Sequence, residues 1–460
     1  MKSSFDFPSG LTLIVGLGVS GWSCVRFLVQ QGQAVAVTDS RDIAPYSGDL
    51  REQYPDIQCS LGGFDSALFS EADEIIVSPG IALDTPEIVS AREAGKRIIG
   101  DIELFSRYAS APVVAITGSN GKSTVTTLLG EMAAANGTHV AVGGNIGTPA
   151  LDLLDDDVEL YVVELSSFQL DLTDSLKTET AVVLNVSADH MDRHASMHEY
   201  ARIKFKVYEN CLHPIVDNDF ISTAQQLLPL LSQNLLESAV NYSLAEPVFD
   251  ADFGVRDING QQYLAHGRKN LLPLIELTMS GRHNISNALA ALAMGSELGL
   301  SEENMLAALK VFSGLPHRCQ FVAVVNGRSF VNDSKGTNVD ASIAAILSIN
   351  TPIVLIAGGD DKGADLSALR DAAIGKVNAV VTLGRAAEEI ESLFAGHANT
   401  RRAEDMLDAV KYAFDFAGEG ETVLLSPACS SLDMFLSYEA RGDAFVDAVK
   451  SLQHDAEVQQ

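Results

Sequence analysis

The residues with the clearest chemical meaning lie in a glycine-rich segment, 118–124, with the sequence GSNGKST. It follows the apolar run 113–117 and opens a helical pattern. A strand, a glycine loop and a helix N-terminus form a cradle of N–H donors for phosphate oxygens, in which Lys122 can neutralise charge and Ser123 can bind Mg²⁺. The standard pattern has a glycine where Ile116 stands, so this loop is shorter. The segment predicts a nucleoside triphosphate site.

A second glycine-rich segment, 16–21 (GLGVSG), follows the apolar run 11–15, and Asp39 ends the next such run. Glycines let the backbone approach a pyrophosphate, a helix N-terminus supplies N–H groups, and an acid can accept ribose hydroxyls. The segment therefore predicts a dinucleotide or nucleotide site, with a tight turn that simply requires glycine as the alternative. A nicotinamide dehydrogenase would also need a reduction site, and no downstream segment plainly supplies one.

Other polar residues follow the triphosphate segment. Glu164 ends the apolar run 160–164, where open α/β sheets place their ligands, so its carboxylate is a candidate for Mg²⁺. A solvated acid at the strand end is the alternative. Lys204 and Lys206 lie on a predicted helix, where lysines are ordinarily surface residues.

Three histidines, His190, His194 and His198, are spaced i, i+4 and i+8. On a continuous helix this spacing could build a zinc site. The alternative is that one histidine works beside the phosphates while the other two lie on a solvated face.

Short apolar, β-branched runs alternate with longer helical patterns along the whole chain, which predicts an α/β fold around parallel sheets. The candidate strands are Leu11–Val15, Ala34–Thr38, Glu74–Val77, Val113–Thr117, Leu160–Glu164, Ala181–Asn185, Ile353–Ala357, Ala379–Leu383 and Thr422–Leu425. They form three groups, which predict domains over residues 1–100, 101–314 and 315–460. Within the middle group, an Asn259-Gly260 pair between apolar stretches predicts a β-hairpin.

Composition excludes several classes of protein. The 460 residues include 31 Lys+Arg and 61 Asp+Glu, a net charge of −30, and 47% of them are hydrophobic. A surface this acidic repels phosphate backbones, so nucleic acid and anionic membranes are poor partners. The five cysteines form no CxxC pair, and no apolar run reaches the ~20 residues of a membrane span. With no signal peptide visible, we expect a cytoplasmic protein without membrane insertion.

The sequence resembles the Mur ligase family of bacterial peptidoglycan synthesis, ATP-dependent enzymes that add amino acids to UDP-N-acetylmuramic acid. The matching stretches are TGSNGKST (117–124), GGNIG (143–147), ELSSFQL (164–170), NVSADHMDRH (185–194), GRHNISNALAA (281–291), GLPHR (314–318), NDSKGTN (332–338), GGDDKG (358–363) and SPACSSLDMF (426–435). Together with Ser78-Pro79-Gly80, the last two are most similar to the D-glutamate-adding members. The Asp-Asn-Pro-Arg motif of the diaminopimelate-adding members is not present.

The resemblance implies a Rossmann-like N-terminal domain that binds the UDP-sugar, a central P-loop ATPase-like domain and a Rossmann-like C-terminal domain that binds the amino acid. It implies ligation of D-glutamate to UDP-N-acetylmuramoyl-L-alanine through an acyl phosphate and a tetrahedral intermediate, by a monomer with ATP and two Mg²⁺ ions. The glycine-rich segment 16–21 then binds UDP in place of a dinucleotide.

The resemblance also implies roles for individual residues. Those for ATP are Gly118, Ser119, Asn120, Gly121, Lys122, Ser123, Thr124, Asn284, Asn287, Arg318 and Asp333. Those for the UDP-sugar are Val19, Ser20, Asp39, Ser40, Arg41, Ser78, Gly80 and Asn145. Those for the amino acid are Lys335, Thr337, Lys362, Ser431, Leu432 and Tyr438, the last where a phenylalanine is expected. Catalysis falls to Lys122, Glu164, His190 and Lys204, and metal binding to Ser123, Glu164, His190 and a carbamylated Lys204. Lys206 lies on another helix face.

Four other functions are weighed as alternatives. A Mur-type ligase of different amino-acid specificity shares every motif above, while a dehydrogenase rests on the first glycine loop only. A catalytically silent nucleotide-binding protein would not need Lys122, Glu164, His190 and Lys204 together. Folylpolyglutamate synthase shares the ATP loop but would not need the N-terminal nucleotide domain.

Overall fold

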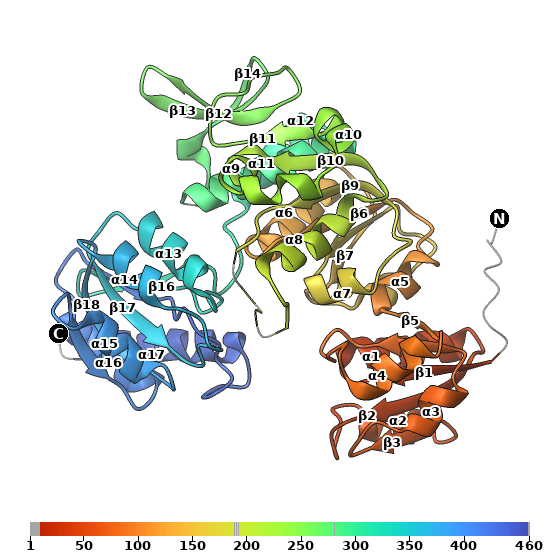
Figure 1. The fold of residues 1–460 in the computed structure, drawn as a ribbon. Helices are drawn as coiled ribbons and strands as arrows, with labels where there is room; N and C mark the ends of the chain where they lie inside the picture. The colour runs from red at the N-terminus through yellow and green to blue at the C-terminus, as the bar shows by residue number, and fades with distance from the viewer. Residues whose placement is uncertain (1–9, 188, 190, 192, 280, 459–460) are drawn as a thin grey trace. The chain divides into compact units, whose positions relative to one another are not determined.

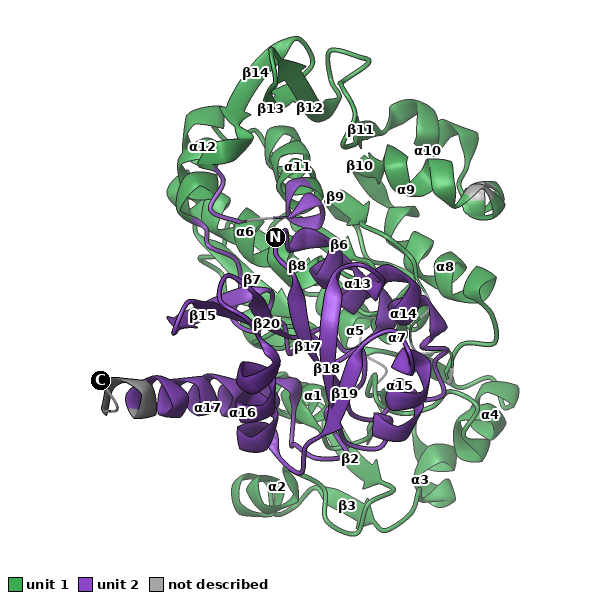
Figure 2. Ribbon diagram, turned by 90° about the vertical axis from the view of Figure 1, so that its left-hand side faces the viewer, with its two compact units in different colours: residues 1–276, 286–311 green, residues 277–285, 312–460 purple. Residues whose placement is uncertain are grey.

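A computed structural model describes residues 10–187, 189, 191, 193–279 and 281–458 (Figure 1). The chain divides into two compact units, the first made of residues 1–276 and 286–311 and the second of 277–285 and 312–460 (Figure 2). The first unit contains two β-sheets and the second contains one. Three α/β layers, each built on a mainly parallel sheet, therefore carry the candidate site residues.

The N-terminal sheet has the strand order β3-β2-β1-β4-β5, and all its pairs are parallel. Its crevice lies where the order reverses, between β1 and β4, which is where such sheets bind ligands. Its strands are β1 (Leu11–Val15), β2 (Ala34–Asp39), β3 (Gln58–Leu61), β4 (Glu74–Val77) and β5 (Arg97–Ile99). The helices are α1 (Val19–Gln30), α2 (Ser47–Gln53), α3 (Ser66–Glu71), α4 (Pro86–Glu93) and α5 (Asp101–Ser106).

The central sheet has nine strands in the order β14-β13-β12-β11-β10-β9-β6-β8-β7. They are β6 (Val113–Thr117), β7 (Val140–Gly144), β8 (Leu160–Glu164), β9 (Thr178–Val183), β10 (Cys211–Asp217), β11 (Val240–Tyr242), β12 (Phe253–Ile258), β13 (Gln261–His266) and β14 (Lys269–Pro273). Only the pairs of β13 are antiparallel. The predicted hairpin is present, because Asn259 and Gly260 join β12 to β13 with the positive φ values, 54° and 84°, that a tight two-residue turn requires.

Seven α-helices accompany the central sheet in the described part of the chain: α6 (Lys122–Ala135), α7 (Ser167–Asp171), α8 (Met197–Phe205), α9 (Asn218–Thr223), α10 (Gln233–Ser238), α11 (Arg282–Glu297) and α12 (Glu302–Val311). Short 3₁₀ turns occupy Ala150–Leu153, Lys206–Tyr208, Gln225–Leu230 and Leu274–Glu276. Ser301 caps the N-terminus of α12, because its hydroxyl accepts the Asn304 N–H at 3.2 Å.

The third sheet has the order β15-β16-β20-β17-β18-β19, with only the pair β15 and β16 antiparallel. Its strands are β15 (Gln320–Val325), β16 (Arg328–Asn332), β17 (Ile353–Gly358), β18 (Val377–Leu383), β19 (Asn399–Arg402) and β20 (Thr422–Leu425). Its helices are α13 (Val339–Ser348), α14 (Ser367–Ala373), α15 (Ala387–Phe394), α16 (Met406–Phe416) and α17 (Tyr438–Val458). Alternate residues of β17 enter two separate cores: Val354 and Ile356 pack with α16 and α17, while Ile353 and Leu355 pack with α13, α14 and α15.

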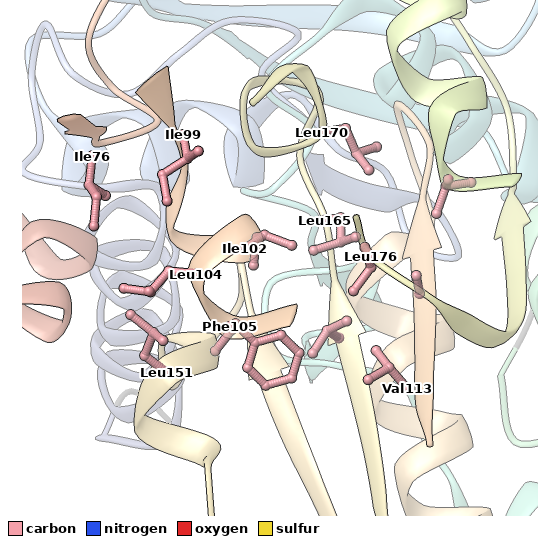
Figure 3. Packing of buried hydrophobic residues seen from close by; sticks show 14 of the residues in the cluster. Ile76, Ile99, Ile102, Leu104, Phe105, Val113, Leu151, Leu165, Leu170 and Leu176 are labelled. Atoms are coloured by element: carbon pink, nitrogen blue, oxygen red, sulfur yellow. The ribbon is translucent and has the colours of Figure 1, made fainter. Parts of the chain in front are cut away.

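One core joins the two sheets of the first unit. Figure 3 shows Ile102, Leu104 and Phe105 of α5 among Leu151 and Leu165 in this cluster. The three α5 side chains are fully buried, and burial of each contributes about 2 kcal/mol relative to exposure. The short helix α5 therefore packs against both sheets and connects them.

All nine strands named from the sequence are present, with one informative difference in their ends. The strand predicted over Ala181–Asn185 ends at Val183, and Asn185 lies in the following loop. In the described chain, the helices are all too short or too polar to span a lipid bilayer.

Candidate active site

The triphosphate loop connects the end of β6 to the start of α6. Gly118 and Gly121 have φ values of +149° and +85°, a region that side chains with a Cβ rarely adopt. A Cβ on Gly121 would lie 2.5 Å from Oδ1 of Asn287, which comes from α11. The absence of a side chain at Gly121 therefore lets Asn287 lie against the loop. The triphosphate loop and Asn287, both predicted to bind ATP, are thus in contact.

A second loop, directly after β9, holds the triphosphate loop in place. Asn185 Oδ1 accepts the Asn120 N–H at 2.8 Å, and Asn185 Nδ2 donates to the Asn120 carbonyl at 3.1 Å. The Ser119 hydroxyl donates to the Ser187 carbonyl at 3.0 Å, and the Ser187 N–H donates back to it at 2.9 Å. Sequence reasoning did not single out Asn185 and Ser187, although their position at the end of a strand next to β6 was a usable signal.

Two lysines converge on this loop. Nζ of Lys122 donates to the carbonyls of Gly118 and Ser119, and Nζ of Lys204 donates to the same Gly118 carbonyl, all at 2.9 Å. The Lys204 side chain is buried, and its burial, together with the charge of Lys122, holds its pKa well below the ordinary value for lysine. Lys206 instead binds Asp174 at 3.0 Å, so the two lysines lie on different faces as predicted.

A stack of rings leads away from Lys204. Its Nζ lies 4.6 Å from the ring centroid of Tyr200, the Tyr200 ring lies 4.7 Å from His194, and His194 stacks on Phe168 at 5.4 Å. The guanidinium of Arg193 covers Phe168 at 4.7 Å. Contacts of this kind attract a cation to a ring face and hold aromatic rings in fixed orientations.

Arg193 also connects this stack to the N-terminal sheet, because it donates to the carbonyls of Gly80 and Ile81 at 3.2 and 2.9 Å. Gly80 is one of the residues predicted to meet the UDP-sugar. The stack thus links a loop of the N-terminal sheet to the lysine beside the triphosphate loop.

The histidines do not form the helical zinc site that their spacing allows. α8 begins at Met197, so His194 precedes the helix, and its Nε2 lies 3.0 Å from the Ser167 hydroxyl. Burial lowers the pKa of His194 and favours the neutral ring. His198 is exposed, and His190 lies outside the described residues. Within the described ranges, no three His, Cys, Asp or Glu side chains gather as a metal site would need.

The donor set near the triphosphate loop nevertheless fits Mg²⁺, which prefers hard oxygen ligands and keeps several waters. Glu164 is buried at the end of β8 and pairs in register with Ile116 of β6, so its carboxylate lies beside the start of the loop. Asn145 Nδ2 donates to Glu164 Oε1 at 2.7 Å and orients it. Ser123 is buried in the first turn of α6.

The N-terminal residues predicted to bind the UDP-sugar surround the ends of β1, β2 and β4. Asp39 accepts the Leu17 N–H at 2.7 Å and the Arg41 guanidinium at 2.6 and 2.8 Å. Burial alone would raise the pKa of Asp39, but these hydrogen bonds outweigh it and the pKa is lowered. Asp39 therefore stays ionised and orients Arg41.

Close packing requires glycine in the same crevice. A Cβ on Gly21 would lie 1.9 Å from the Gly16 carbonyl oxygen, which also accepts the Ser78 hydroxyl at 2.7 Å. Val19 and Ser20 begin α1, where N–H groups point outward, and Ser40 is exposed beside Arg41. The crevice can hold an anionic nucleotide.

In the second unit, most of the predicted amino-acid residues lie on loops after β16, β20 and β17, which are neighbours in the sheet, and Tyr438 is the first residue of α17. The Lys335 Nζ lies 3.8 Å from the ring centroid of Tyr438, and Lys362 adopts a positive φ of 52°. Ser431 is buried whereas Leu432 is 69% exposed. Thr337 follows two residues after Lys335, and its N–H donates to the Lys335 carbonyl at 2.7 Å. A backbone bridge between Asp360 and Ser430 joins the loops after β17 and β20.

Three residues predicted for ATP also belong to this unit: Asn284 at the start of α11, Arg318 and Asp333. Arg318 lies close enough to His283 for its charge to lower the pKa of that imidazole, after the larger effect of burial. Asp333 is buried, which raises its pKa to about 6.

The sequence did not indicate that Arg441 holds these loops together through buried hydrogen bonds. Arg441 is 2% exposed and donates to the Ser334 hydroxyl at 3.0 Å, the Ser334 carbonyl at 2.8 Å and the Cys429 carbonyl at 3.1 Å. Burial lowers the pKa of Arg441 to about 10. No local pattern marks this arginine, because its partners come from distant parts of the chain.

Comparison with known proteins identifies the family. Models described as "Mur ligase MurD-like, N-terminal domain", "Mur ligase middle domain" and "Mur ligase, glutamate ligase domain" match residues 11–100, 116–295 and 317–429. The chain is 48% identical over 444 residues to a UDP-N-acetylmuramoylalanine–D-glutamate ligase of Pseudomonas fluorescens, covering 96% of this chain and 98% of that protein. A protein of the same name from Nitrosococcus oceani is 46% identical and is covered to 96%, as is this chain.

Solved structures share the fold at low identity. A UDP-N-acetylmuramate-alanine ligase from Thermotoga maritima has a TM-score of 0.62 at 18% identity, with 96% of this chain and 99% of that chain covered. A pseudomurein peptide ligase from Methanothermus fervidus has a TM-score of 0.59 at 16% identity, with coverage of 97% and 99%. On the matched domains, the identity over nearly its full length and the shared fold, the chain belongs to the Mur ligase family.

Proposed function

We propose that the chain ligates D-glutamate to the L-alanine carboxylate of UDP-N-acetylmuramoyl-L-alanine, with conversion of ATP to ADP and phosphate, in peptidoglycan precursor synthesis. The observation that carries this proposal is the 48% identity, over nearly the full length of both chains, to ligases named for D-glutamate. The triphosphate loop with its two lysines supports the ATP-dependent part.

The chemistry explains why ATP is required. A carboxylate does not acylate an amine, because its oxide is a poor leaving group and the two groups exchange a proton instead. Transfer of the γ-phosphoryl group to the alanine carboxylate gives an acyl phosphate. The D-glutamate nitrogen then attacks the carbonyl carbon, and the tetrahedral intermediate expels phosphate as the amide forms. Each step brings anions together, so fixed cations must lie around them.

In this proposal the loop 118–124 binds the ATP phosphates, with Lys122 as the cation and Thr124 as an additional hydroxyl. Asn287 approaches the nucleotide from α11, and Asn284, Arg318 and Asp333 approach it from the second unit. Ser123, Glu164 and His190 hold Mg²⁺, with two ions per site. When bound, Mg²⁺ neutralises phosphate charge and polarises the phosphoryl oxygens.

We further propose that Lys204 is carbamylated. Its lowered pKa supplies the neutral amine that attacks CO₂; an N–C bond forms, and the nitrogen loses a proton to solvent. The product carries carboxylate-like oxygens, which can bind Mg²⁺ where an ammonium cannot. A neutral amine is thereby replaced by a metal ligand near Glu164.

The remaining proposed contacts follow the two sheets that carry them. The UDP-sugar lies in the crevice of the N-terminal sheet, with Arg41 oriented by Asp39 toward its anionic groups. Val19, Ser20, Ser40, Ser78, Gly80 and Asn145 complete its binding site. The carboxylates of D-glutamate bind Lys362, Ser431 and Leu432, with Lys335, Thr337 and Tyr438 lining the same face.

The proposed domains cover residues 1–100, 101–314 and 315–460, one around each sheet. Since a single chain carries all three sets of residues, we propose that the enzyme acts as a monomer. Light scattering at the protein concentration used for activity tests this.

The deciding experiment measures phosphate release with ATP and UDP-N-acetylmuramoyl-L-alanine while D-glutamate, L-alanine, L-lysine and diaminopimelate are supplied in turn. Of the four amino acids, we expect only D-glutamate to cause phosphate release. We expect no release when UDP-N-acetylmuramic acid, which lacks L-alanine, replaces UDP-N-acetylmuramoyl-L-alanine. Release with another amino acid would indicate a different specificity. A change in NAD(P)H absorbance without phosphate release would indicate a dehydrogenase.

A further inference from the structure

A line of buried hydrogen bonds crosses the second unit beneath the loops that carry the proposed substrate residues. The Ala428 N–H donates to the Ser342 hydroxyl at 2.9 Å, the hydroxyls of Ser342 and Ser426 are 2.8 Å apart, and the Ser426 hydroxyl donates to Asp333 Oδ2 at 2.7 Å. Ser342 and Ser426 are both fully buried. The line joins three segments that lie far apart in the sequence.

The direction of these bonds follows from their chemistry. Ser426 has one hydroxyl proton, and an ionised carboxylate is the strongest acceptor within reach, so that proton goes to Asp333. Ser426 can then only accept from Ser342, which in turn accepts the Ala428 N–H. Each hydroxyl therefore donates once and accepts once, and removal of either leaves a buried polar group without its partner.

The two ends of the line are the two halves of the proposed site in this unit. Asp333 follows β16, and its other oxygen accepts the Cys319 N–H at 3.1 Å, directly after Arg318. Ala428 has a φ of +59°, a strained conformation for a residue with a Cβ, and stands three residues before Ser431. Strain of this kind persists only where neighbouring groups hold the backbone.

Ser342 differs from the other buried side chains of α13. The buried side chains of α13 that pack on the sheet are apolar, as with Ala345 and Ile346 in the same core. The Ser342 hydroxyl lies 3.4 Å from the Gly336 carbonyl, farther than from Ser426, so its shorter contacts are those of the line. Burial of a hydroxyl costs free energy unless it is hydrogen-bonded.

We propose that Ser342 and Ser426 are positioning residues, which hold the Asp333 carboxylate and the backbone from Ala428 to Leu432 in one arrangement. The group proposed to face ATP and the loop proposed to face D-glutamate are thereby held in a fixed position relative to each other. This inference rests on the proposed function for the roles of the two ends, but not for the existence of the line.

The test compares Ser342→Thr with Ser342→Val, two side chains of nearly the same shape of which only threonine keeps the hydroxyl. We expect the valine variant to raise the KM for both ATP and D-glutamate about tenfold relative to the threonine variant, the size expected for a lost buried hydrogen bond. The KM for UDP-N-acetylmuramoyl-L-alanine should be similar in the two, whereas the thermal midpoint of the valine variant should be the lower one, because the buried Ala428 N–H loses its acceptor. Ser392→Ala, at an exposed position of α15, is the control and should match wild type.

Two further measurements keep the outcome clear. If Ser342→Val does not fold, Ser426→Ala, a smaller change, takes its place. It should raise the same two KM values. Hydrogen exchange of the peptide 426–432 should be faster in Ser342→Val than in Ser342→Thr, because the Ala428 amide loses its acceptor. Equal exchange and equal KM values in the threonine and valine variants would overturn the inference.

Failure of the proposed function is distinguishable from failure of this inference. If wild type releases no phosphate with the three substrates, the function is wrong, and the exchange comparison still tests the line. If wild type is active and only one of the two KM values changes, the two halves are not set together.

Discussion

Lys204 experiences opposing influences on its charge. Burial and the nearby ammonium of Lys122 favour the neutral amine, whereas the carboxylates of Asp189 and Glu164 favour the ammonium, and the first two prevail. The neutral amine is the form that reacts with CO₂. The surroundings of Lys204 therefore favour the uncharged form that the proposed carbamylation requires.

Lys204→Ala should abolish most of the phosphate release, because the metal-binding oxygens and the hydrogen bond to Gly118 are both lost. Short carboxylic acids that enter the vacated space should restore part of the activity. Lys206→Ala is the matched control, since Lys206 pairs with Asp174 on another face, and it should retain full activity. Undiminished activity of Lys204→Ala without any added acid would contradict the assignment.

Tyr438 should act through its ring rather than its hydroxyl, because the ring face lies against Lys335. Tyr438→Phe should leave the KM for D-glutamate within about twofold of wild type, and Tyr438→Leu should raise it about fivefold, which corresponds to about 1 kcal/mol for a cation–π contact. Steady-state kinetics at varied D-glutamate checks this. A phenylalanine variant as impaired as the leucine variant would assign the effect to the hydroxyl.

At this scale the sequence predicted the residues whose meaning is local. The segment 118–124 can be read because strand, glycines, lysine and serine are consecutive. Arg441 and Ser342 could not be found, because their partners come from loops about 100 and 85 residues away, a separation that only the fold brings to hydrogen-bond distance.

The ends of the strands were predicted well where they depend on neighbouring residues, and less well where they depend on residues distant in the sequence. β6 and β8 were predicted with correct ends, since apolar residues stop where polar residues begin. The end of β9 was wrong by two residues, because Val186 extends the apolar pattern while Asn185 is drawn to the triphosphate loop. Tertiary hydrogen bonds there outweigh strand propensity.

A buried carboxylate at the end of β10 gives a test of pH dependence at the level of one helix. Asp217 caps α9, accepting the N–H groups of Asp219 and Phe220 at 2.8 and 3.1 Å. Burial nevertheless raises its pKa to about 6. Because the folded protein then binds this proton more tightly than the unfolded chain, the free energy of unfolding falls as the pH rises from the ordinary value of 3.8 through about 6.

Asp217→Asn keeps a capping oxygen but does not titrate. Between about pH 4.5 and about pH 7.5, the free energy of unfolding of the variant should rise relative to that of wild type. The rise should be at most about 3 kcal/mol, the value for a shift of about two pKa units. Thermal midpoints of both proteins across this interval check the sign. A difference that stays constant with pH would show that Asp217 does not carry the effect.

For the whole molecule, the net charge of −30 disfavours polyanionic partners, but it does not prevent small anions from binding in a local site. The proposed substrates are all anionic, and the cations that would meet them are local: Lys122, Arg41, Arg318, Lys335 and Lys362. The general field and the local site therefore have opposite signs. Binding should depend on these few side chains rather than on the surface as a whole.

The triphosphate loop belongs to the first unit and the proposed D-glutamate residues to the second, so catalysis should require the second unit to close on the first. Small-angle scattering should show a smaller radius of gyration with a non-hydrolysable ATP analogue and UDP-N-acetylmuramoyl-L-alanine than without them. Lys122→Ala, which should not bind the analogue, is the control. An unchanged radius for wild type with both ligands would contradict closure.

The burial of α5 has a consequence for how such proteins can be divided and recombined. Ile102, Leu104 and Phe105 serve a core shared by the N-terminal and central sheets, so a cut near Gly100 would expose apolar side chains on both fragments. The two sheets should therefore unfold in one transition and resist separate expression. An exchange of the nucleotide-binding domain between relatives would have to carry α5 and its facing side chains as a single inherited block.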